Sequence, residues 1–112
     1  MDNQFIEITS LTSLDDFVAR LAGAPGVLFK HSDSCGVSAS AYSEMARLSY
    51  PIGLVVVQHA RAVSDEIEKR WRVSHETPQV LIVRDGTALW NASHFRVKAA
   101  DVESALNQAN GE

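Results

Sequence analysis

The order of apolar runs and helix signals along this 112-residue chain predicts an α/β fold, with a central mixed sheet between two layers of helices. Short apolar or β-branched runs alternate with segments of helical periodicity. Near the end, two strand-like runs flank Asp85-Gly86, a strong hairpin signal, and one more helix follows. The resulting order is βαβαβαββα. This length suits one domain, so residues 1–112 are treated as a single unit.

The first half of the chain supplies two strands and two helices. Phe5-Ile6-Glu7-Ile8 predicts a short first strand. Ser13 is expected to cap a helix that ends at Gly23. Its inward face holds four apolar residues: Leu14, Phe17, Val18 and Leu21. The run Val27-Leu28-Phe29 predicts a buried strand, and a second helix is expected from about Cys35 to Leu48.

The second half supplies a central strand, a helix, the hairpin and a last helix. Leu54 to Val57 is continuous and rich in valine, which is typical of a strand covered on both faces. Ser64 is expected to cap a helix over Asp65 to Trp71, with its basic residues late, as the helix dipole favours. The hairpin strands are expected at 80–83 and 88–90, and the last helix at 99–109.

A thioredoxin-like fold accommodates all these elements in this order. A flavodoxin-like sheet would need a final parallel strand, and the hairpin at Asp85-Gly86 argues against that.

Composition narrows the class of function. The hydrophobic fraction of 46% and the charged fraction of 21% are ordinary for a soluble globular protein. A net charge of −4 without a basic cluster makes nucleic acid an unexpected partner. The first residues lack a secretory signal and the apolar run Ile52 to Val57 is too short to span a membrane, so no membrane association is expected. A free thiol suits a reducing compartment, which predicts a cytoplasmic protein.

Cys35 is the only cysteine, and it lies between a strand-like run and a helix-like run. A helix N-terminus stabilises a thiolate, which is the nucleophilic form of cysteine. The polar, glycine-containing turn before this helix is a poor packing context, which favours a reactive thiol over a structural one. Gly36, Val37 and Ser38 form the expected first turn, so they are candidates for tuning the thiolate.

Thr77-Pro78 opens a later strand, where a proline is sterically tolerated. In a thioredoxin-like fold this proline is cis, and the backbone of the residue before it is held open for the substrate chain. We therefore predict that Thr77 and Pro78 bind substrate backbone beside Cys35.

Three further side chains are candidates for auxiliary roles. Asp33 disfavours a nearby thiolate, and Lys30 and His31 would offset this if their side chains turn towards the site. His75 lies in the loop before Thr77, either beside Cys35 or in solvent. No metal site is predicted, because the ligand spacings that a metal requires are absent.

Four stretches carry a family resemblance. Phe29-Lys30-His31-Ser32 before a Cys-x-x-Ser turn resembles the YtxJ-type monothiol bacilliredoxins, bacillithiol-linked members of the thioredoxin superfamily. Val63 to Ile67 is similar to the start of the family's third helix. The loop 75–79 is similar to its His-Glu-Ser-Pro-Gln loop, and residues 90–95 to its Trp-His-Ala-Ser-His-Trp run. The family turn usually reads Cys-Pro-Ile-Ser, whereas this chain has Cys35-Gly36-Val37-Ser38.

The resemblance implies a monothiol mechanism. Cys35 would take a low-molecular-weight thiol, bacillithiol or a similar co-substrate, from S-thiolated client proteins, with no bound cofactor. Ser38 replaces the second cysteine of a Cys-x-x-Cys pair, which excludes a dithiol reductase mechanism for the isolated monomer.

Two alternatives stay open at this stage, and the oligomeric state is open as well. The turn is also similar to the Cys-Gly-Phe-Ser of monothiol glutaredoxins, which use glutathione and in some cases hold an iron–sulfur cluster. The Trp-Pro insertion associated with cluster binding is not apparent in this chain. The other alternative is a redox-inert thioredoxin-fold interaction module.

Overall fold

Parallel and antiparallel pairing meet at the centre of a five-stranded sheet in the computed structural model, which describes residues 4–111. The strands are β1 (Phe5–Glu7), β2 (Gly26–His31), β3 (Ile52–Val56), β4 (Gln79–Arg84) and β5 (Thr87–Ser93). Their spatial order is β1-β3-β2-β4-β5. β3 runs parallel to β1 and β2, whereas β4 is antiparallel to β2 and β5. The predicted mixed sheet is confirmed.

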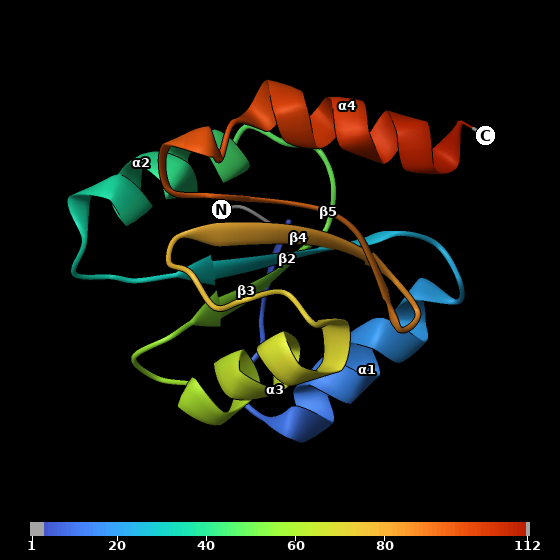
Figure 1. Cartoon of the computed structure of the whole chain (residues 1–112), viewed down its shortest axis with the longest axis horizontal. Coiled ribbons are helices and arrows are strands. Elements are labelled where there is room, and N and C mark those ends of the chain that lie inside the picture. Colours follow the sequence, from blue (N-terminus) through green and yellow to red (C-terminus); the bar gives the residue numbers. More distant parts are fainter. Residues whose placement is uncertain (1–3, 112) are drawn as a thin grey trace.

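Helices cover both faces of this sheet (Figure 1). The helices are α1 (Leu11–Leu21), α2 (Gly36–Met45), α3 (Arg61–Trp71) and α4 (Ala99–Asn110). α1 and α3 lie on one face, and α2 and α4 on the other. A short 3₁₀ helix, η1 (His94–Arg96), joins β5 to α4. The three layers and the order βαβαβαββα are as predicted.

Two apolar cores flank the sheet, and the side chains of β2 point alternately into one and the other. Val27 and Phe29 pack under α2 and α4, whereas Leu28 packs under α1 and α3. Lys30 follows on the same face as Leu28 and is also fully buried, so a charged group lies where the alternation calls for an apolar one. Within residues 4–111, none of the helices combines the length and the apolar character that crossing a membrane requires.

The start of α1 corrects the expectation for Ser13. Ser10 is the N-cap, and its hydroxyl accepts a hydrogen bond from the Ser13 backbone at 3.1 Å. The Ser13 hydroxyl accepts in return from the Ser10 backbone at 3.1 Å. Ser13 is therefore the third helical residue of a capping box, and the prediction that it caps the helix is wrong.

The expectation that Ser64 caps α3 is also wrong. The helix begins at Arg61, Ala60 occupies the N-cap position, and Ser64 is buried within the helix. The Ser64 hydroxyl lies 3.2 Å from Nδ1 of His75 and so serves a loop contact.

Two boundaries near the expected reactive turn also differ from prediction. β2 extends through Lys30 and His31, because both pair with β3 at Val55 and Val56. α2 ends at Met45, three residues earlier than expected. The longer strand and the helix start leave only residues 32–35 in the intervening turn.

Candidate functional site

Cys35 is the N-cap residue of α2, as predicted. Its φ of −124° and ψ of 128° are extended, and its carbonyl oxygen accepts the first helical hydrogen bond from Ala39 at 3.0 Å. The side chain is partly exposed and makes no capping hydrogen bond. Gly36, Val37 and Ser38 supply the backbone N–H groups of the first turn, which have no acceptor within the helix. These groups and the helix dipole place partial positive charge at the start of α2, where Cys35 lies.

Gln58 holds the turn that precedes the cysteine. Its side-chain nitrogen donates to the Ser32 hydroxyl at 2.7 Å and to the Ser34 hydroxyl at 3.0 Å. Its side-chain oxygen accepts from the Asp33 backbone at 3.3 Å. Sequence reasoning missed Gln58, because it lies in a different loop and no local pattern marks a contact over this separation.

Ser38 is fully buried one turn into α2. Its hydroxyl oxygen lies 2.8 Å from Nδ1 of His31 and accepts from the Ser32 backbone at 2.9 Å. The hydroxyl thus joins α2 to the end of β2 and is not hydrogen-bonded to the sulfur of Cys35. Burial lowers the pKa of His31. Because the Ser38 hydroxyl does not contact the sulfur, the predicted effect of Ser38 on the thiolate would act through the turn that this hydroxyl holds.

Thr77 and Pro78 lie at the same end of the sheet as the cysteine turn. Gln79, the first residue of β4, pairs with Lys30 near the end of β2, so the segment before β4 adjoins the edge that leads into α2. The Thr77-Pro78 peptide bond is cis, as predicted. The Pro78 carbonyl oxygen accepts from the His94 backbone at 2.9 Å, which fixes η1 beside this loop.

Lys30 and His75 contact each other and serve the Thr77 loop. Nζ of Lys30 lies 2.9 Å from Nδ1 of His75, and Nε2 of His75 lies 3.2 Å from the Thr77 hydroxyl. Burial lowers the pKa of Lys30 to about 8, and burial is also the main cause that lowers the pKa of His75. The ammonium of Lys30 thus reaches the proline loop.

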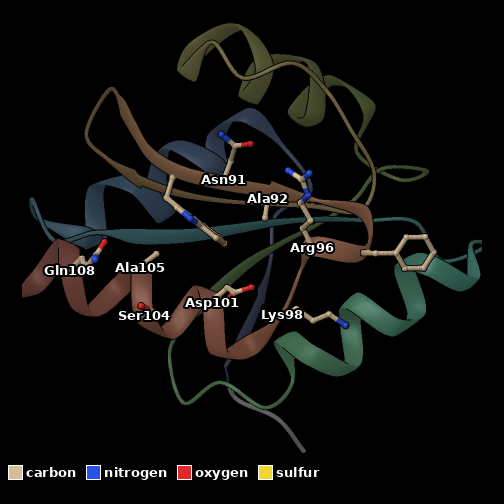
Figure 2. A pocket seen from close by; sticks show the side chains of 10 residues that line it. Asn91, Ala92, Arg96, Lys98, Asp101, Ser104, Ala105 and Gln108 are labelled. Atoms are coloured by element: carbon tan, nitrogen blue, oxygen red, sulfur yellow. The ribbon is translucent and has the colours of Figure 1, made fainter.

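A groove of about 600 Å³ lies between β5, η1 and α4 (Figure 2). Phe95, from η1, is 74% exposed, which makes it the most exposed large apolar side chain within residues 4–111. Arg96, Lys98 and Asp101 add charges of both signs. Phe95 directly follows His94, whose backbone N–H donates to the Pro78 carbonyl oxygen. This end of the groove is therefore next to the Pro78 loop.

Among residues 4–111, no three side chains of His, Cys, Asp or Glu cluster closely enough to hold a metal ion.

Residues 6–102 match the family model described as "Monothiol bacilliredoxin BrxC". The chain belongs to the monothiol bacilliredoxin family. This match runs from the second residue of β1 to the start of α4, and it includes both Cys35 and the Thr77-Pro78 loop.

Solved structures agree with the bacilliredoxin assignment at the level of the fold. One protein described as a candidate oxidoreductase with a thioredoxin fold is 25% identical, with a TM-score of 0.83 over 91% of this chain and 93% of that chain. Thioredoxin from Trypanosoma brucei brucei is 13% identical, with a TM-score of 0.78 over 100% of this chain and 96% of its own. Fasciola hepatica thioredoxin is 11% identical, with a TM-score of 0.75 over 92% and 97%.

Family membership and fold together identify a thiol–disulfide redox protein. Cys35 is the one residue of this bacilliredoxin able to form a disulfide, because the chain has a single cysteine.

Proposed function

We propose that the protein removes a low-molecular-weight thiol, bacillithiol, from mixed disulfides on client proteins through Cys35. The observation that carries this proposal is a single, partly exposed cysteine at the N-terminus of α2, at the sheet edge that also holds cis Pro78. A lone thiol can accept one thiol group and cannot resolve the resulting disulfide by itself. We propose a reducing, cytoplasmic setting, no bound cofactor and no nucleic-acid or membrane partner.

The exchange takes place in two balanced steps. The Cys35 thiolate attacks the small-thiol sulfur of the mixed disulfide, so a Cys35–small thiol disulfide forms and the client–sulfur bond breaks. The client leaves as a thiolate and takes a proton from solvent. The thiolate of a second small thiol then attacks the small-thiol sulfur on Cys35. This step releases a symmetrical small-thiol disulfide and restores the Cys35 thiolate.

The surface around Cys35 supports a polypeptide client. The backbone of Thr77, before cis Pro78, offers main-chain groups to an extended client segment. Phe95 presents an apolar ring beyond the loop, tied to it through the hydrogen bond between His94 and Pro78. We propose that the client chain lies over the loop with its mixed disulfide at Cys35.

The test uses one model protein with a single cysteine, carrying either bacillithiol or glutathione as a mixed disulfide. We expect faster release of bacillithiol than of glutathione by the native protein, with a transient mass increase of one bacillithiol on Cys35. Cys35→Ser should release neither thiol, because a hydroxyl cannot form a disulfide. Client reduction without any adduct on Cys35 would falsify the mechanism.

Further outcomes separate the alternatives. Preferred release of glutathione would replace bacillithiol as the co-substrate. A brown, cluster-loaded protein after anaerobic purification would favour an iron–sulfur carrier. Binding of the mixed disulfide without any exchange would favour an interaction module.

A further inference from the structure

A chain of hydrogen bonds links a buried lysine to the residue before cis Pro78. Lys30 lies in the central strand β2 with no exposed surface, and its ammonium is 2.9 Å from Nδ1 of His75. The opposite ring nitrogen of His75 lies 3.2 Å from the Thr77 hydroxyl. The backbone N–H of His75 donates to the Glu68 carboxylate at 3.0 Å, so α3 also holds this loop.

Two groups contact Nδ1 of His75, the Lys30 ammonium at 2.9 Å and the Ser64 hydroxyl at 3.2 Å, and of these only the ammonium is restricted to donating. An ammonium group has three donors and no acceptor, so Nδ1 of His75 must accept from it. A neutral imidazole then carries its proton on Nε2, and this N–H donates to the Thr77 hydroxyl. The lowered pKa of His75 is consistent with a neutral ring at pH 7.

Burial of this ammonium has an energetic cost that an apolar side chain would avoid. Three acidic groups face the pair and favour the ammonium, namely Glu68 and Asp65 of α3 and Glu76 of the loop. The neighbouring positions of β2 are apolar, so an apolar side chain at position 30 would supply the same packing as Lys30. Its specific contribution is the hydrogen bond to His75.

We propose that Lys30 is a positioning residue for the substrate-binding backbone at Thr77 and that it acts through the imidazole of His75. This inference rests on the proposed function, in which that backbone holds the client chain. We expect the reactivity of Cys35 to be independent of the hydrogen-bond chain, because Gln58 and Ser38 hold the cysteine turn separately.

The first test observes His75 directly and needs no client. ¹⁵N NMR of the reduced protein at pH 7 should show His75 as the Nε2–H tautomer, assigned through the loss of its signals in His75→Gln. Lys30→Met keeps most of the length of the side chain and leaves only the Ser64 hydroxyl, which can donate or accept, at Nδ1, so the His75 signals should move to a mixture of tautomers. Lys69→Met, on the exposed side of α3, is the matched control and should leave them unchanged. An unchanged pure Nε2–H tautomer in Lys30→Met overturns the proposal.

The second test separates client positioning from thiol chemistry. For a bacillithiol mixed disulfide of the model protein, Lys30→Met should raise KM about tenfold while kcat changes less than about threefold, as expected for the loss of one charge-assisted hydrogen bond. Alkylation of Cys35 by iodoacetamide should stay within about twofold of native. An unchanged KM, or an equal loss in alkylation, overturns the positioning role.

A double-mutant cycle identifies the route. Thr77→Val removes the hydroxyl that receives the His75 hydrogen bond, so its effect on KM and that of Lys30→Met should be strongly non-additive. Additive effects contradict transmission through His75. If the native protein exchanges no mixed disulfide, the proposed function fails, whereas the NMR result and the alkylation rates remain measurable.

Discussion

The side-chain nitrogen of Gln58 lies 3.0 Å from the hydroxyl of Ser34, so the loop after β3 holds the residue that immediately precedes the only cysteine. The same amide group also contacts Ser32 and the backbone of Asp33. One exposed side chain thus fixes three successive residues of the turn. Gln58 thus orients the turn that leads into Cys35, although it makes no hydrogen bond to the sulfur.

Gln58→Leu should loosen this turn. The substitution removes three hydrogen bonds at an exposed site, so we expect a loss of about 1 kcal/mol in the free energy of unfolding and faster amide exchange at residues 32–35. Hydrogen exchange followed by NMR measures both. Gln108→Leu, an exposed glutamine of α4, is the control and should leave the turn protected. Native protection of residues 32–35 in Gln58→Leu contradicts the clamp.

Ser38→Ala should destabilise the junction between β2 and α2. The partly buried Ser32 N–H loses its acceptor and His31 loses its partner, so the free energy of unfolding should fall by about 1–3 kcal/mol. Urea unfolding measures the loss, and Ser40→Ala, exposed on the same helix, should have little effect. Bacillithiol release should slow modestly. Native stability in Ser38→Ala would show that these two hydrogen bonds add nothing to folding.

Lys30→Met should change how stability depends on pH. Burial lowers the pKa of Lys30 from 10.5 to about 8, so between these pH values the unfolded chain binds more protons than the folded chain. The stability of the native protein should therefore rise as pH increases from 8 to 10.5. Glu68, Asp65 and Glu76 oppose the lowering, and His75 titrates at lower pH, outside this window.

Lys30→Met has no such titration, so its stability relative to that of the native protein should be greatest at pH 7. This relative stability should fall above pH 8. Urea unfolding at pH 7, 8, 9 and 10 measures the trend, with Lys69→Met as the control that tracks the native protein. A relative stability that grows with pH contradicts the assignment of the titrating group.

Gly36→Pro should be accepted at the first position of α2 and should stabilise the protein. A Cβ at Gly36 meets nothing within 4 Å, and the extended backbone of Cys35 is the conformation preferred before proline. Proline restricts the unfolded chain, so we expect a gain of about 0.4–1 kcal/mol in the free energy of unfolding. Gly36→Ala separates the loss of glycine from the effect of the ring. A destabilised Gly36→Pro would mean that the Gly36 N–H has a structural role.

Much of the fold follows from apolar periodicity and turn chemistry. The β4–β5 hairpin is visible in Asp85-Gly86, and the long apolar runs identify β2, β3 and β4 as buried strands. The predicted start of a helix is less accurate where two nearby residues can each act as the N-cap. Ser10 and Ser13 can each cap a helix, and only the reciprocal geometry of the capping box assigns their positions.

The candidate site divides in the same way. A helix start at Cys35 and a cis proline at position 78 follow from the order of elements and the fold that it implies. The contacts of Gln58 and the link from Lys30 to His75 could not be predicted, because each joins residues more than twenty positions apart. Such contacts depend on how the elements pack, and local sequence patterns carry no information about that.

The buried hydroxyl of Ser38 also affects how easily this chain could acquire a second cysteine by mutation. A resolving cysteine could arise at position 38 through one Ser-to-Cys substitution, which would recreate a Cys-x-x-Cys pair. The larger sulfur would enter a site with no exposed surface, and a thiol is a weak acceptor for the Ser32 N–H. The first step towards a dithiol protein would therefore lose stability before any disulfide formed. The contacts of the Ser38 hydroxyl thus disfavour the return of a second cysteine at position 38. Compensating substitutions at His31 or Ser32 would have to come with it.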